Sequence, residues 1–152
     1  MMYTILDVKK ACTKLLRQTF PNITAYDADT FDGYQRPSFF TEIRTRGRRP
    51  ESALLRTIGF IYTITYFETT HDEAECLRIY EAVCSAFGHA VRVFEGSRIR
   101  VVVESISYQW VGENLDKMQI EVRFRDAVEL GGATDDNELM EQIDVEYTQE
   151  EA

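Results

Sequence analysis

The sequence has 152 residues, 44% of them hydrophobic, which suffices for one domain with a sizeable core but not for two full domains. Its 17 Lys and Arg against 26 Asp and Glu give a net charge of −9, and this excess is local. All basic residues lie at or before Arg125, whereas nine acids fall between Glu129 and Glu151. A neutral body with an acidic tail argues against generic or sequence-specific duplex nucleic-acid binding, which rests on neutralising phosphates.

The first third of the sequence predicts one helix and two strands. Thr4 and Asp7 have the spacing of a capping box, and apolar residues then recur at helical spacing until Pro21 ends the segment. A short strand is expected at 23–26. Residues 38–46 alternate between apolar and polar side chains, which predicts a half-buried strand.

The middle of the sequence predicts a long strand followed by the second helix. The alternation at 54–67 favours a strand that pairs with 38–46 as a hairpin. A helix is then expected from an N-cap at Thr70, with Glu73 completing a capping box, to Gly88. Its apolar line is predicted to comprise Leu77, Tyr80, Cys84 and Phe87, flanked by Cys76 and Val83.

Three further strands are predicted before the acidic tail. They lie at 90–95, 97–111 and 117–125, and the second changes phase at 103–105, as a bulge requires. The order is helix, three strands, helix, three strands, which indicates an α+β fold with a largely antiparallel sheet and two helices packed on it. We expect one domain over 1–128 and an acidic C-terminal arm over 129–152.

The cysteines and the longest apolar run favour a cytoplasmic protein. Cys12, Cys76 and Cys84 are an odd number without a CxxC pair, so neither a disulfide framework nor a zinc knuckle is indicated. The longest uncharged run, 57–67, is far shorter than the roughly 20 residues of a membrane span. The first residues lack a signal-peptide pattern, and no membrane association is expected.

The search for catalytic and cofactor motifs is negative. No phosphate-binding glycine loop, nucleophile elbow or zinc-binding helix motif occurs, and His71 and His89 lie at opposite ends of the predicted second helix. The acidic turn with Asp27, Asp29 and Asp32 fits no EF-hand register. Two distant carboxylates could still form a hydrolytic pair, so an enzyme remains the minority alternative. No cofactor or metal is predicted.

Two segments favour contacts with other molecules. Residues 44–52 read as a polar loop between paired strands, and this loop is expected either to project into water or to meet a partner. Its arginines, with one more in the following strand, are Arg44, Arg46, Arg48, Arg49 and Arg56.

The second segment is the acidic tail after Gly131 and Gly132. Five apolar residues return within it, and these are predicted to pack as a strand or short helix on this domain, a neighbouring subunit or a partner. They are Leu139, Met140, Ile143, Val145 and Tyr147.

Taken together, these segments resemble the tail terminators of tailed phages and prophage-derived tail-like particles. The resemblance lies in TILDVKKACTKLLRQTFPNITAY, in RPSFFTEI, in FIYTITYF followed by DEAECLRIYEAV, and in a VRFRD strand before an acidic tail with MEQID. It extends over nearly all of 3–147 as a pattern of apolar and polar positions.

The resemblance implies a non-enzymatic structural protein that is made in the host cytoplasm and becomes part of the particle. Such a protein caps the head-proximal end of the tail tube as a hexameric ring, stops its polymerisation and offers a docking surface for the head-completion or collar protein. The implied partners are its own copies, the tail tube protein and that head-side protein, with the sheath as a further candidate. The arginines would then contact a subunit or the tube.

Two alternatives stay open at this point. A head-tail connector or stopper shares the size, the ring habit and the lack of catalytic motifs. A small cytoplasmic ligand-binding or enzymatic α+β domain would instead need a pocket with convergent polar groups.

Overall fold

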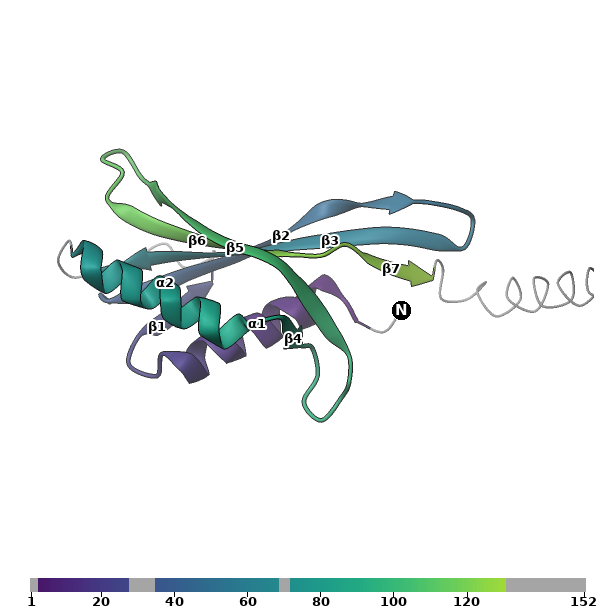
Figure 1. Ribbon diagram of the computed structural model, residues 1–152, viewed down its shortest axis with the longest axis horizontal. Helices are drawn as coiled ribbons and strands as arrows, with labels where there is room; N and C mark the ends of the chain where they lie inside the picture. The colour runs from purple at the N-terminus through teal and green to yellow at the C-terminus, as the bar shows by residue number, and fades with distance from the viewer. Residues whose placement is uncertain (1–2, 28–34, 69–71, 131–152) are drawn as a thin grey trace, which may run out of the picture.

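The computed structural model describes residues 3–27, 35–68 and 72–130, which form two helices and seven strands. Both helices lie on the same side of a curled sheet (Figure 1). This is the predicted α+β fold, in the predicted order, with one strand added at the end. The elements are α1 (Ile5–Thr19), β1 (Thr24–Asp27), β2 (Ser38–Pro50), β3 (Leu55–Phe67), α2 (Glu73–Phe87), β4 (Ala90–Arg92), β5 (Arg100–Val111), β6 (Lys117–Phe124) and β7 (Ala127–Leu130).

Strand β3 is the centre of the sheet, whose strand order is β1-β2-β3-β6-β5-β4. One edge of β3 pairs with β2 along the whole strand, as the predicted hairpin. Its other edge pairs first with β7, over residues 55–58, and then with β6, over residues 61–66. All pairings are antiparallel except β1 with β2. The predicted phase change in β5 is confirmed as a register shift between Val103 and Ser105.

Helix α1 forms for the reasons that its sequence indicates. The Thr4 hydroxyl accepts from the Asp7 N–H, and the Asp7 carboxylate accepts from the Thr4 N–H at 2.8 Å, which confirms the capping box. The apolar stripe packs on β3, where the Tyr62 hydroxyl shares a buried 2.9 Å hydrogen bond with the Thr13 hydroxyl. Val8, Cys12 and Leu16 of α1 are buried in this core.

Helix α2 begins later than predicted, and its buried stripe is rotated. The N-cap is Asp72, whose carboxylate accepts from the N–H groups of Ala74 and Glu75; the predicted cap, Thr70, lies outside the described residues. Tyr80 turns to the edge of the sheet, where its hydroxyl donates to the Ile106 carbonyl at 2.7 Å. The stripe therefore comprises Cys76, Ile79, Val83 and Phe87, while Leu77, Tyr80 and Cys84 are only half-buried.

The predicted arginine loop is wrong as a loop, because β2 continues through it to Pro50. A bulge between Thr45 and Gly47 shifts the register by one residue. The turn between β2 and β3 comprises only residues 51–54. Strand β7 was not predicted at all. It extends to Leu130 and thus past residue 128, where we placed the end of the domain.

The capping geometry of α2 gives a direct test. Replacing Asp72 by Ala leaves two N–H groups of the first turn without their acceptor, so the free energy of unfolding should fall by about 0.5–2 kcal/mol. Urea unfolding measures this change. Glu73→Ala in the same turn is the matched control and should change stability by less, since the Asp72 carboxylate and not that of Glu73 accepts these hydrogen bonds. Equal losses in the two variants would contradict the assignment of the cap.

Candidate functional site: the assembly surfaces

The distal halves of β2 and β3, together with β7, form a three-stranded arm over residues 44–58 and 127–130. In Figure 1 this arm extends from the body beyond the region that the helices cover. It holds all five arginines that the sequence singled out, on strands rather than on a loop.

Arg46 is tied to the body of its own chain. Its guanidinium lies 3.0 Å from a Glu104 carboxylate oxygen and 3.2 Å from Asp126 Oδ1, and it donates to the Phe124 carbonyl at 3.3 Å. The bulge beside Gly47 turns β2 so that this side chain crosses β3 at Gly59. Arg46 therefore fixes the arm to β5 and to the link between β6 and β7.

Arg49 uses the same carboxylate, at 2.7 Å from its Nη2 to Asp126 Oδ2. Arg46 and Arg49 are thus paired within the chain, through a carboxylate that lies far from them in the sequence. Arg44 is exposed and Arg56 half-buried, and neither joins an ion pair among the described residues. Arg48 is exposed as well.

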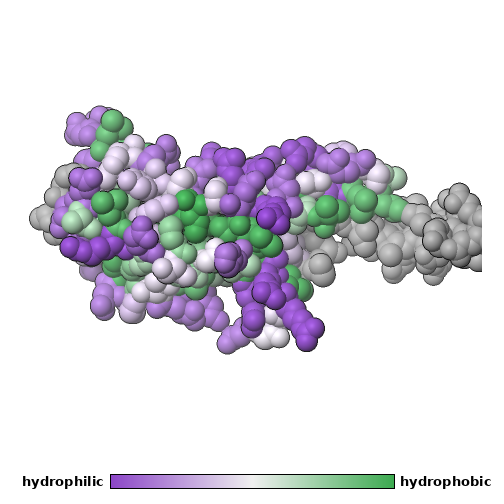
Figure 2. All heavy atoms as spheres, in the orientation of Figure 1, coloured by the Kyte–Doolittle hydropathy of each residue, from purple (hydrophilic) through white to green (hydrophobic). Residues whose placement is uncertain are grey.

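Apolar surface accompanies these charges. Figure 2 shows it in two places on the visible face, over the middle of β5 and along the arm. Large apolar side chains on these strands with at least 39% exposure are Leu55, Val102, Tyr108 and Val128. A mixture of exposed apolar and charged groups is typical of surfaces that meet another protein.

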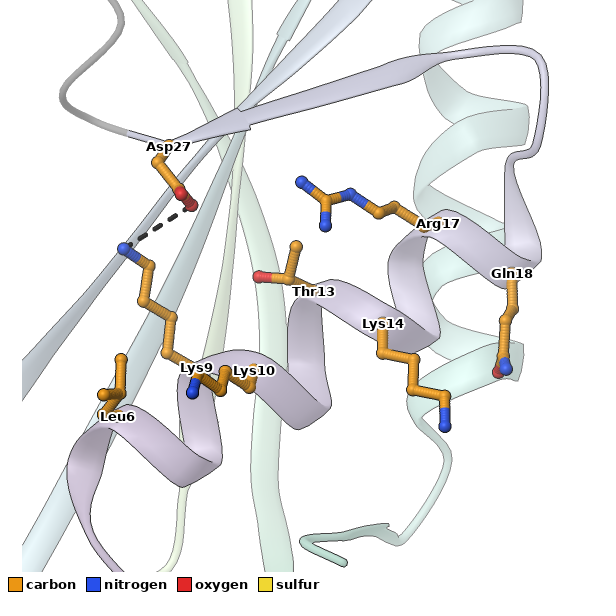
Figure 3. A pocket seen from close by; sticks show the side chains of 8 residues that line it. All are labelled: Leu6, Lys9, Lys10, Thr13, Lys14, Arg17, Gln18 and Asp27. Atoms are coloured by element: carbon orange, nitrogen blue, oxygen red, sulfur yellow. Dashed lines mark ion pairs between the residues drawn. The ribbon is translucent and has the colours of Figure 1, made fainter. Parts of the chain in front are cut away.

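A second charged surface lies along α1, and the sequence analysis did not identify it. Between α1 and β1 there is a hollow of about 490 Å³ whose lining includes Lys9, Lys10, Lys14 and Arg17 (Figure 3). Lys9 lies 3.5 Å from Asp27, and Arg17 donates to the Ala25 carbonyl at 3.1 Å. In Figure 3, Lys14 and Gln18 point away from β1.

The thiols of Cys12 and Cys76 are held in their protonated form. Burial raises the pKa of Cys12, and burial together with a 3.2 Å hydrogen bond to Glu68 raises the pKa of Cys76 to about 12. No three His, Cys, Asp or Glu side chains of the described ranges are grouped as metal ligands. His71, Asp29 and Asp32 lie outside those ranges, as do Leu139, Met140, Ile143, Val145 and Tyr147.

The fold and its surfaces define a small α+β protein with a three-stranded arm and a helix that carries a cationic face. Residues 7–130 match the family model described as phage tail terminator protein, from α1 to β7. The chain belongs to this family of structural, tail-terminating proteins.

Solved structures support the fold independently. A chain of the "Virion of native gene transfer agent (GTA) particle" is similar to this chain, with a TM-score of 0.52 and 14% sequence identity. The match covers 85% of this chain and 99% of that one. No curated protein matches the sequence. Within the described ranges neither helix, at 15 residues each, has the length and apolarity to cross a membrane.

At Gly59, where the Arg46 side chain crosses β3, any added side chain should destabilise the fold. A Cβ added there would overlap the Asp126 carboxylate and come within 3.3 Å of Arg46 Cβ, so Gly59→Ala should lower the free energy of unfolding by about 1–3 kcal/mol. In an Asp126→Ala background the same substitution should be milder by about 1 kcal/mol, because the closest obstacle is gone. Urea unfolding of the four proteins in this double-mutant cycle measures the coupling, and additive losses would contradict it.

Proposed function

We propose that this chain caps the head-proximal end of a tail tube as a ring of six copies. In this role it stops tube polymerisation and offers a surface to the head-completion or collar protein. The observation that carries the proposal is the family match, which spans the described domain from the first turn of α1 to the end of β7. A connector or stopper would occupy a neighbouring position, but no feature of this chain favours it over a terminator.

The open edges of the sheet support a ring. Beyond Thr41, β2 pairs only with β3, and from Val103 onward β5 pairs only with β6 among the described strands. These edges differ in sequence and lie on opposite sides of the sheet. A contact between one edge and the other is heterologous, and such contacts close into rings when the rotation allows it.

The arm is the proposed contact with a neighbour or with the tube. Arg46 and Arg49 hold its shape through Asp126, while Arg44 and Arg56, which join no ion pair among the described residues, would face acidic groups of the partner in charge-assisted hydrogen bonds. The apolar residues of the C-terminal segment, Leu139, Met140, Ile143, Val145 and Tyr147, would pack on an adjacent subunit or on the head-side protein once the ring has formed. Assembly would take place in the host cytoplasm, with the sheath as a further neighbour.

The capping function predicts a defined stoichiometry and a defined tail length. Native mass spectrometry of tube ends bound by this protein should give six copies per end, because a ring that seals the tube has to match its symmetry. Particles assembled without the protein should carry tails of irregular length by electron microscopy. Uniform tails in its absence, or any other copy number at the tube end, would contradict the proposal.

The exposed arginine at the base of the arm gives the second functional prediction. Arg44→Glu should leave the free energy of unfolding within about 0.5 kcal/mol, because the residue is exposed and joins no ion pair among the described residues. Capping, measured as the fraction of tails of normal length, should be lost. Arg78→Glu is the matched control, with the same charge change at an exposed position of α2, and should cap normally. Equal capping by both variants would remove Arg44 from the interface.

A further inference from the structure

The cationic side of α1 borders a second hollow, of about 400 Å³, between α1, the end of α2 and β4. Lys10, Lys14 and Gln18 line this hollow as well as the one beside β1, so the two form neighbouring grooves along the exposed side of the helix. We call them together the α1 groove. Its floor near β4 is apolar and includes Ala11, Leu15, Ala86, Val91 and Val93.

The positive charge of the α1 groove is only partly compensated, with Lys9 paired to Asp27 at 3.5 Å. Lys10, Arg17 and Arg92 are exposed, and none of them joins an ion pair among the described residues. Lys14 has one partner, Glu95 at 3.1 Å, and both side chains are more than half exposed, so the pair is weak and exchangeable. A carboxylate-rich ligand would therefore find cations here that no buried carboxylate already occupies.

The same chain contains a segment with the complementary chemistry. Residues 131–152 include no Lys or Arg, and acidic residues separate their apolar ones. At 143–147 the alternation is strict: Ile143, Val145 and Tyr147 share one face of an extended chain, while Asp144 and Glu146 share the other. Such a segment can set its apolar face on the floor of the groove and its carboxylates against the lysines on the rim.

We propose that, before assembly, the C-terminal segment around 143–147 docks in the α1 groove of its own chain. The inference goes beyond the terminator function and does not depend on it. The groove matches both sides of the segment, because an apolar floor of Ala11, Leu15 and Val91 lies beside the cations Lys10, Lys14 and Arg92.

The reach of the chain allows this docking within one molecule. Leu130 pairs with Leu55, and the ring of Tyr3, just before α1, lies 6.3 Å from that of Phe60. The five residue-to-residue steps from Leu55 to Phe60 span about 17 Å along the strand, and Lys10 lies roughly 10 Å further along the helix. The 13 residues from Leu130 to Ile143 reach about 43 Å when extended. Because the tether keeps the segment at a high effective concentration, docking in the same chain is favoured over docking in a second copy.

Limited proteolysis of the full-length protein tests the proposal. A glutamyl endopeptidase cleaves after Glu141 and Glu146, and its rate follows the undocked population when opening is fast. The triple variant Lys10→Gln/Lys14→Gln/Arg92→Gln should be cleaved in this segment about tenfold faster than the unmodified protein at low salt. High salt should remove most of the difference. The matched control, Arg44→Gln/Arg48→Gln/Arg56→Gln, loses the same charge from the arm and should be cleaved at the unmodified rate.

A photo-crosslink from the segment identifies its binding surface. With p-benzoylphenylalanine in place of Ile143, crosslinked peptides should contain residues 10–18 or 90–93 of the same molecule. A mixture of isotope-labelled and unlabelled protein distinguishes crosslinks within a chain from those between chains. Crosslinks to the arm, faster cleavage of the arm variant alone, crosslinks mainly between chains, or equal cleavage of all three proteins would each overturn the proposal. Because the assay needs no tail tube, a failure of the capping function would leave its outcome unchanged.

Discussion

The structure depends on β3, whose 13 residues pair with β2 along one edge and, along the other, with β6 of the body and β7 of the arm. Toward its C-terminus, Tyr62, Ile64 and Tyr66 are buried against the helices and give the domain its core. Toward its N-terminus the same strand leaves the helices and is held by β2 and β7 alone. Gly59 lies at the change, and its missing side chain lets Asp126 and Arg46 meet across the strand. The position of the arm is thus fixed to the core through one continuous strand.

Local patterns in the sequence predicted the elements whose causes are local. The Thr4 and Asp7 box, the alternation of β3 and the phase change in β5 all arise from neighbours within a few residues. The prediction of a loop at 44–50 was wrong, because contacts with residues outside this segment keep it in a strand. Its charges resemble those of a solvated loop, whereas the pairing of Arg49 with Thr57 and the contact of Arg49 with Asp126, 77 positions away, keep it in a strand. Strand β7 has four residues, too few for a period to stand out.

The candidate surfaces, too, were predictable only where their causes are local in the sequence. The sequence identifies where charged residues cluster, but the fold decides which of those charges remain available. The arginine cluster is partly neutralised by Asp126 and Glu104, while the lysines of α1, which the sequence analysis did not single out, border two grooves. Ion pairs between residues far apart in sequence produce this difference, and a count of charges along the chain does not contain it.

Each open edge of the sheet carries a feature that disfavours pairing with an arbitrary strand. At the edge of β5 the Tyr80 hydroxyl donates a hydrogen bond to the Ile106 carbonyl. This carbonyl is therefore not free to accept from the backbone of another strand. At β2 the exposed side chains of Glu42, Arg44 and Arg48 surround the edge, and charged edges disfavour pairing with other strands. The same charges permit a strand with complementary groups in a fixed register. An edge guarded in this way discriminates between strands by charge, because a strand with complementary groups pairs with it at a lower cost than one without them.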